Sequence, residues 1–146
     1  MKRQCGFTIV EIITVVVIIA ILASIGVVAS NYVQKQARDN ERKSDVLLLK
    51  NALEKYYDEN GTYPIFSACQ SSGGGCDAST LIPALVPTYI AQVPSVPTGV
   101  NYKYVHHSSV TISANYGIYV TREADVPCRT GNLYSTWWST TAMCGY

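Results

Sequence analysis

The chain has 146 residues, which is enough for one folded domain of ordinary size and no more. Its 11 basic and 10 acidic side chains leave a formal net charge of +1, so the charge gives no reason to expect a nucleic-acid or acidic partner. Hydrophobic residues make up 48% of the sequence, a fraction raised by a long apolar run in the first third of the chain.

A short basic lead, Lys2 and Arg3, precedes this apolar run. Residues 12–29 contain just two polar side chains, Thr14 and Ser24. An apolar helix of about 18–20 residues is long enough to cross a bilayer. Because basic residues favour the cytoplasmic side, we expect the chain that follows the span to face outward.

One carboxylate, Glu11, lies at the start of the apolar run. An ionisable group in lipid costs about 2.5–3.5 kcal/mol on insertion scales unless it has a partner. The sequence has no basic residue close behind Arg3 to serve as that partner. Cleavage after Gly6 would create an α-amine on Phe7, four residues from Glu11 on the same helix face. We therefore expect Glu11 to pair with this amine or with that of a neighbouring copy.

The segment Gly6-Phe7-Thr8-Ile9-Val10-Glu11, followed by an apolar helix, resembles the class III signal of the type IV pilin and type II secretion pseudopilin superfamily. The resemblance implies that a prepilin peptidase cleaves between Gly6 and Phe7 and that Phe7 is N-methylated. It also implies that Glu11 brings each subunit into register in a filament. Loss of the leader, residues 1–6, removes two positive charges and changes the net charge from +1 to −1.

Two other interpretations of the N-terminus stay open. The tripeptide Val27-Val28-Ala29 is a passable cleavage site for an ordinary secretory signal peptide. Against it, the apolar run exceeds the usual length of about 7–15 residues, and Glu11 is unfavourable at its start. A plain signal anchor would instead keep Met1 and carry Glu11 by accident.

A second helical pattern follows without an intervening glycine or proline. Apolar side chains recur at helical spacing and predict one buried face. These residues are Val46, Leu48, Leu49, Ala52, Leu53, Tyr56 and Tyr57. Gly61 suits a left-handed helix cap, and Pro64 follows shortly after it. We predict one continuous helix from about Thr8 to about Glu59, with its many charges on a solvated face.

The remainder of the chain predicts a small antiparallel sheet. Residues 65–100 are rich in glycine and proline and contain one short helix candidate, residues 80–86. Alternating side chains predict strands over residues 102–106 and 110–121, and a third over residues 133–139. The predicted fold class is α+β, with a long N-terminal helix packed on the sheet of a small head.

We therefore predict three parts of the chain: a leader, residues 1–6, a transmembrane and filament-core helix, residues 7–33, and an extracytoplasmic head, residues 34–146. The segment from Asn51 to Pro64 adds to the resemblance, because it is similar to the helix end and turn of type II secretion major pseudopilins. Together the two similar segments cover about sixty residues.

The head retains an even number of cysteines, which in an exported domain predicts disulfides. They are Cys69, Cys76, Cys128 and Cys144, whereas Cys5 lies in the leader. Three connectivities are possible, and proximity favours Cys69–Cys76 and Cys128–Cys144. A zinc site that includes His106 and His107 is the alternative, although the chain has no C-x₂-C pair.

Other candidate sites are weak. Type II secretion major pseudopilins carry a calcium loop near the position of Glu123 and Asp125, but the segment Thr121–Asp125 lacks a dense set of oxygen ligands. His106 and His107 would point to opposite faces of a strand, so we expect surface or edge residues rather than a catalytic pair. The sequence predicts no resident cofactor and no enzyme activity.

The resemblance implies a structural subunit of a type IV pilus, a homopolymer held together by its N-terminal helices. The alternative is the major pseudopilin of a type II secretion system. The disulfides favour the pilus, and the turn at Tyr57–Pro64 favours the pseudopilin. The implied partners are further copies of the chain, a prepilin peptidase and the assembly machinery of the inner membrane. The protein would begin as a single-pass inner-membrane precursor and end in a surface pilus or a periplasmic pseudopilus.

A different class of protein also stays open. An anchored or secreted binding module could use Trp137, Trp138 and the eleven tyrosines as an exposed patch, although core packing is the simpler use of these rings.

Overall fold

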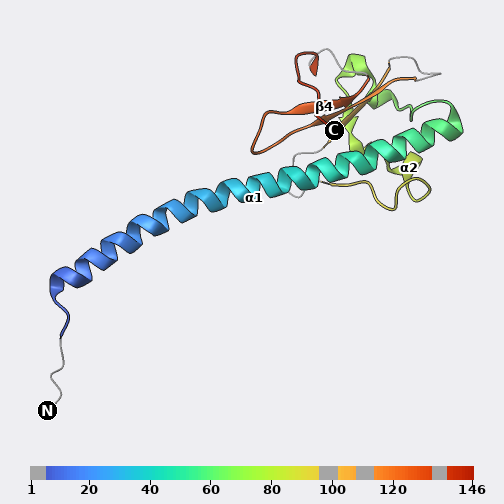
Figure 1. The fold of residues 1–146 in the computed structure, drawn as a ribbon. Coiled ribbons are helices and arrows are strands. Elements are labelled where there is room, and N and C mark those ends of the chain that lie inside the picture. The colour runs from blue at the N-terminus through green and yellow to red at the C-terminus, as the bar shows by residue number, and fades with distance from the viewer. Residues whose placement is uncertain (1–5, 96–101, 108–113, 133–137) are drawn as a thin grey trace. The chain divides into compact units, whose positions relative to one another are not determined.

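The computed structural model describes residues 6–95, 102–107, 114–132 and 138–146, and for residues 26–29 it describes the backbone (Figure 1). The chain divides into two compact units, Met1–Ala37 and Arg38–Tyr146, which are described separately below.

A single helix, α1, spans Ile9–Asn60 and is 52 residues long. This confirms the continuous helix that the sequence predicts, with each end within one residue of the expected place. The helix ends at Gly61, whose φ of 66° is left-handed and whose N–H donates to the Tyr57 carbonyl at 2.8 Å. A residue with a Cβ adopts this conformation at a cost in energy, so glycine is favoured at this position, where it caps the C-terminus of the helix.

In the second unit, the described residues form a four-stranded antiparallel sheet in the order β1-β2-β3-β4. The strands are β1 (Cys76–Asp77), β2 (Lys103–His106), β3 (Tyr116–Val120) and β4 (Cys128–Gly131). Ile118 of β3 lies opposite Tyr104 of β2 and Thr130 of β4, so these three side chains share one face. The α+β fold class is confirmed.

The strand predictions are right in part. β2 and β3 lie where alternation predicts them, whereas β1 and β4 were not expected. The residues between 108 and 113 and between 133 and 137 lie outside the described residues. Trp138 and Ser139 form a turn and not the end of a strand, so that part of the prediction is wrong.

The inner face of α1 packs against the sheet and forms the core of the second unit (Figure 1). Leu49 and Leu53 are completely buried, together with Tyr104 and Ile118 of the sheet. Burying a leucine contributes about 1.5–3 kcal/mol, so these contacts provide much of the stability of the unit. Leu48 is 52% exposed, which makes its assignment to the buried face wrong.

Short helices lie on both sides of β1. η1 (Ser67–Cys69) and η2 (Ser71–Gly73) lie between α1 and β1, and η3 (Ala78–Leu81) and α2 (Ile82–Leu85) lie between β1 and β2. The helix expected over residues 80–86 is therefore present as η3 and α2. Leu81 and Leu85 are fully buried and extend the same core.

Candidate functional site

Thr8 and Glu11 form a capping box at the start of α1. Glu11 Oε2 accepts the Thr8 N–H at 2.7 Å and the Thr8 hydroxyl at 2.8 Å, while the Glu11 N–H donates to Thr8 Oγ1 at 3.3 Å. A Thr followed three residues later by Glu is the sequence signature of this motif. Thr8 therefore gives Glu11 two neutral donors that were not expected, while no described basic residue pairs with it.

The two oxygens of Glu11 differ in their contacts. Oε2 receives both Thr8 donors, whereas Oε1 accepts no hydrogen bond from any residue that the structure describes. Gly6 and Phe7 lie just before the helix and outside any regular element. Phe7 is 83% exposed, and the bond between these two residues is open on the surface.

The first unit buries nothing that the structure describes. Every residue in the ranges 6–25 and 30–37 is exposed, and α1 contains an apolar stretch long enough, by length and composition, to cross a membrane. The hydroxyl groups of this apolar stretch are satisfied locally, because Thr14 Oγ1 donates to the Glu11 carbonyl at 2.9 Å and Ser24 Oγ to the Ile21 carbonyl at 2.7 Å. A helical stretch that is apolar on all sides suits lipid or other apolar helices.

An ionic cluster ties α1 to the loop after β3 within the second unit. Arg38 donates to Glu123 Oε2 from Nη2 at 2.6 Å and from Nε at 3.0 Å, and its Nε also donates to Oε1 at 3.1 Å. Arg42 bridges Glu123 and Asp39. The Asp39 carboxylate also accepts the backbone N–H groups of Glu123 and Ala124, at 2.8–3.0 Å. Arg42 is 4% exposed, so the expectation that all the helix charges are solvated is wrong here.

The charges in this cluster lower the pKa values of its acids. The hydrogen bond from Arg38 is the largest influence on Glu123 and, with Arg42 and against desolvation, lowers its pKa to about 2. Burial by itself would raise the pKa of Asp39, but the N–H donors of Ala124 and Glu123 and the Arg42 guanidinium hold it below its ordinary value.

The two calcium candidates have other partners in the structure. Glu123 is occupied by two guanidinium groups, and Asp125 forms an ion pair with Arg122 at 2.6 Å. Across the described part of the chain, no group of three or more His, Cys, Asp or Glu side chains is placed to hold a metal ion. The cationic partners of these two acids are arginines.

The four head cysteines form two disulfides, Cys69–Cys76 and Cys128–Cys144. These are the two pairs that proximity along the chain favours. Because all four sulfurs are in disulfides, none of these thiols is left to bind zinc. His106 is fully buried, and its ring nitrogens lie 2.6 Å from the His107 carbonyl and 2.8 Å from the Phe66 carbonyl. The expectation of a surface residue is wrong for His106, and His107 is exposed as expected.

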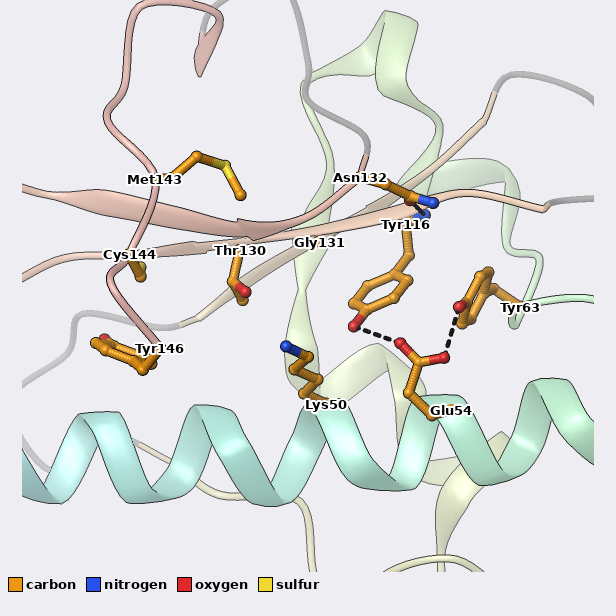
Figure 2. Close-up of a pocket in the computed structure, with 10 residues that line it drawn as sticks. All are labelled: Lys50, Glu54, Tyr63, Tyr116, Thr130, Gly131, Asn132, Met143, Cys144 and Tyr146. Carbon is orange, nitrogen blue, oxygen red and sulfur yellow. Dashed lines mark hydrogen bonds between the residues drawn. The ribbon is translucent and has the colours of Figure 1, made fainter.

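A cavity of about 310 Å³ lies between α1 and the strands of the second unit (Figure 2). Glu54 on α1 accepts the Tyr116 hydroxyl at 3.0 Å and the Tyr63 hydroxyl at 2.9 Å, one on each carboxylate oxygen. Burial first, and then the Glu54 carboxylate, raises the pKa of both tyrosines. Lys50 and Thr130 project into the same space from the helix and from β4.

Gly131 explains why the strands meet so closely beside this cavity. Its φ is 91°, and a Cβ at this position would collide with the carbonyl oxygen of Tyr116. Glycine is therefore required where β4 passes β3. The Tyr116 N–H, in turn, donates to the Asn132 side-chain oxygen at 3.0 Å.

Most of these contacts join residues that are far apart in the sequence and were not predicted. The T-x-x-E spacing of Thr8 and Glu11 was a readable signal for the capping box. By contrast, Arg42 and Glu123 are 81 residues apart, and Lys50 and Thr130 meet through the packing of a helix on a sheet. No local pattern in a single sequence reports such contacts.

Comparison with known proteins gives consistent matches. Residues 1–27 match the family model described as the prokaryotic N-terminal methylation motif. The chain is 34% identical over 111 residues to the type II secretion system core protein G of Aeromonas hydrophila, covering 70% of this chain and 73% of that protein. The protein of the same name from Vibrio cholerae is 33% identical over 72% of this chain and 73% of its own length. The one from Klebsiella pneumoniae is 32% identical over 77% and 84%. No solved structure gave a significant match.

Proposed function

Since this chain belongs to the family of the type II secretion system core protein G, the major pseudopilins of the type IV pilin-like superfamily, we propose that it is the structural subunit of a type II secretion pseudopilus. The relatives favour this function over the type IV pilus, which was the first expectation. The observation that carries the proposal is the apolar stretch of α1, in which every described residue is exposed. Such a surface needs lipid or further copies around it.

Processing would come first. A prepilin peptidase would remove residues 1–6 by cleaving between Gly6 and Phe7, and Phe7 would then be N-methylated. The exposure of Phe7 and the irregular backbone on both sides of the bond support this step, because a protease needs an accessible and extended segment. Before assembly the span would hold the protein in the inner membrane, with residues 34–146 on the outer side.

Glu11 would then bring subunits into register. Its Oε2 is held by Thr8, which orients the carboxylate and leaves Oε1 without a partner among the described residues. The α-amine of Phe7 in a neighbouring copy would bind there. In low dielectric, a subunit placed out of register would leave a buried charge unpaired, and this penalty selects the correct position.

The test compares Glu11→Gln with Glu41→Gln, a matched change at an exposed carboxylate on the same helix. An unpaired buried charge costs several kcal/mol, and each 1.4 kcal/mol changes an equilibrium constant by a factor of ten. We therefore expect Glu11→Gln to lower the yield of sheared filaments by at least about tenfold, while Glu41→Gln keeps it. Leader removal, read by mass spectrometry of the N-terminus, should persist in both variants. Wild-type filament yield from Glu11→Gln would contradict the role given to Glu11.

A type IV pilus subunit is the second candidate, because both head disulfides are formed. Deletion of the gene separates the two functions. Loss of protein secretion without loss of surface fibres supports the pseudopilus, and the reverse result supports the pilus.

A further inference from the structure

We propose that the cavity between α1 and β4 is a binding site for a carboxylate group that carries a small apolar body. The site lies wholly within the second unit, so a free acid can reach it without filament assembly. Its anion-binding end is formed by Lys50 and Thr130, and its walls by Tyr116, Met143 and Tyr146.

Lys50 provides the positive charge. Its side chain is half-buried and points from α1 toward the strands, and it forms no ion pair with any described residue. The nearest acid along the helix is Glu54, but the oxygens of Glu54 are turned to the hydroxyls of Tyr116 and Tyr63 (Figure 2). A half-buried ammonium without a counter-ion is an unbalanced charge, which an incoming anion would neutralise.

Thr130 provides the second, independent contact. This residue is 3% exposed, and its hydroxyl forms no hydrogen bond within the part of the chain that the structure describes. The hydroxyl points from β4 into the cavity, on the side that Lys50 faces (Figure 2). The hydroxyl is open to the cavity and not sealed in the core, so an incoming group can reach it and form a hydrogen bond with it.

The size and lining of the cavity select the kind of ligand. A volume of about 310 Å³ is at the lower end for a ligand site, which suits a short acid rather than a large cofactor. One ammonium and one hydroxyl match the single charge of a carboxylate, whereas a phosphate dianion is usually held by several donors, such as a helix N-terminus or arginines. The rings of Tyr116 and Tyr146 and the thioether of Met143 would contact the apolar carbons of the acid.

Two sources could supply this carboxylate. One is a free short-chain acid. The other is an acidic side chain on a second copy of the chain, for which Asp58 is suited, because it is exposed and forms no hydrogen bond or ion pair with a described residue.

The first arm of the test measures the free acid on the full chain in detergent micelles. Sodium propionate is titrated at constant ionic strength against sodium chloride, and the methyl resonance of Thr130 is followed by NMR. We expect a saturable shift with propionate and none with chloride. Lys50→Met should weaken the binding at least about tenfold, the loss expected for a charge-assisted hydrogen bond. Lys55→Met, at an exposed lysine outside the cavity, should leave it unchanged.

Thr130→Val keeps the shape of the side chain and removes the hydroxyl, so it tests the site even if Lys50→Met fails to fold. The resonance followed is then the Tyr116 amide, and propionate affinity should again fall.

The second arm uses assembled filaments that mix isotopically light and heavy chains. A zero-length carbodiimide should join Lys50 of one copy to an acid of another more efficiently than it joins Lys55. This cross-link without propionate binding identifies a second copy as the source, and saturable propionate binding identifies the free acid. If the cavity shows neither result, it holds water only and the proposal is overturned. Failure to form filaments would count against the proposed function and leave the first arm intact.

Discussion

Residues 6–37 and residues 38–146 share one helix but use their side chains in opposite ways. In the first unit every described side chain is exposed, although most of them are apolar. In the second unit the same helix buries one stripe, including Leu49 and Leu53, against a sheet. An all-round apolar surface demands partners outside the chain, whereas a single apolar stripe is satisfied by the chain's own fold. The first unit is therefore built for assembly and the second for independent stability.

The sharpest test of this contrast replaces leucines in the two units. Leu53→Ala should lower the free energy of unfolding of the head by about 2–5 kcal/mol, because it leaves a cavity in the core. Leu48→Ala, at a side chain that is 52% exposed, should change it by less than about 0.5 kcal/mol. Leu22→Ala, in the first unit, should leave it unchanged.

Both tryptophans lie in the second unit by sequence, so their fluorescence during denaturation of the full chain in detergent reports the head alone. Equal destabilisation by Leu22→Ala and Leu53→Ala would show that the two units do not differ in the way described.

The disulfides should stabilise the second unit by unequal amounts. Cys128–Cys144 spans 16 residues and Cys69–Cys76 spans 7. Each disulfide restricts the unfolded chain, so its removal lowers the free energy of unfolding. We expect a loss of about 3 kcal/mol when Cys128 and Cys144 are replaced by alanines, and about 2.4 kcal/mol when Cys69 and Cys76 are replaced. The same fluorescence measurement gives both values. A larger loss from the shorter loop would mean that native packing, and not the unfolded chain, sets the effect.

Local patterns in the sequence were enough for the elements with strong periodicity. The continuous helix, its end at Gly61 and the strands β2 and β3 follow from spacing within a few residues. The proximity of the cysteines also favoured the pairs that form. These features depend on neighbours along the chain, which a single sequence displays directly.

The features that were missed depend on distant partners. β1 has two residues and exists because it pairs with β2, so it has no periodicity to detect. Arg42 looked like one more surface charge, since nothing near it predicts that Glu123 will cover it. Leu48 fitted the helical stripe by spacing, but the sheet covers too narrow a face of α1 to bury it.

The ionic cluster gives the smallest predicted effect, a dependence of head stability on pH that the first unit should not share. The folded head holds the pKa of Glu123 at about 2, below its ordinary value of 4.5. A depressed pKa means that the folded state binds fewer protons, so its stabilisation is complete above about pH 5 and is lost as the pH falls toward 2. Asp39, whose pKa is also lowered, should contribute in the same direction.

Unfolding of the full chain should therefore become easier between pH 5 and pH 2, and Glu123→Gln should flatten this profile as well as lower its plateau. The plateau falls because Arg38 and Arg42 lose a charged partner, and the profile flattens because the amide takes up no proton. Profiles that run parallel in wild type and variant would place the acid sensitivity elsewhere in the head. The ion pair between the buried Arg42 and Asp39 is still present in the variant. The pH dependence of unfolding that remains therefore measures how much of the ionic cluster survives without the Glu123 carboxylate.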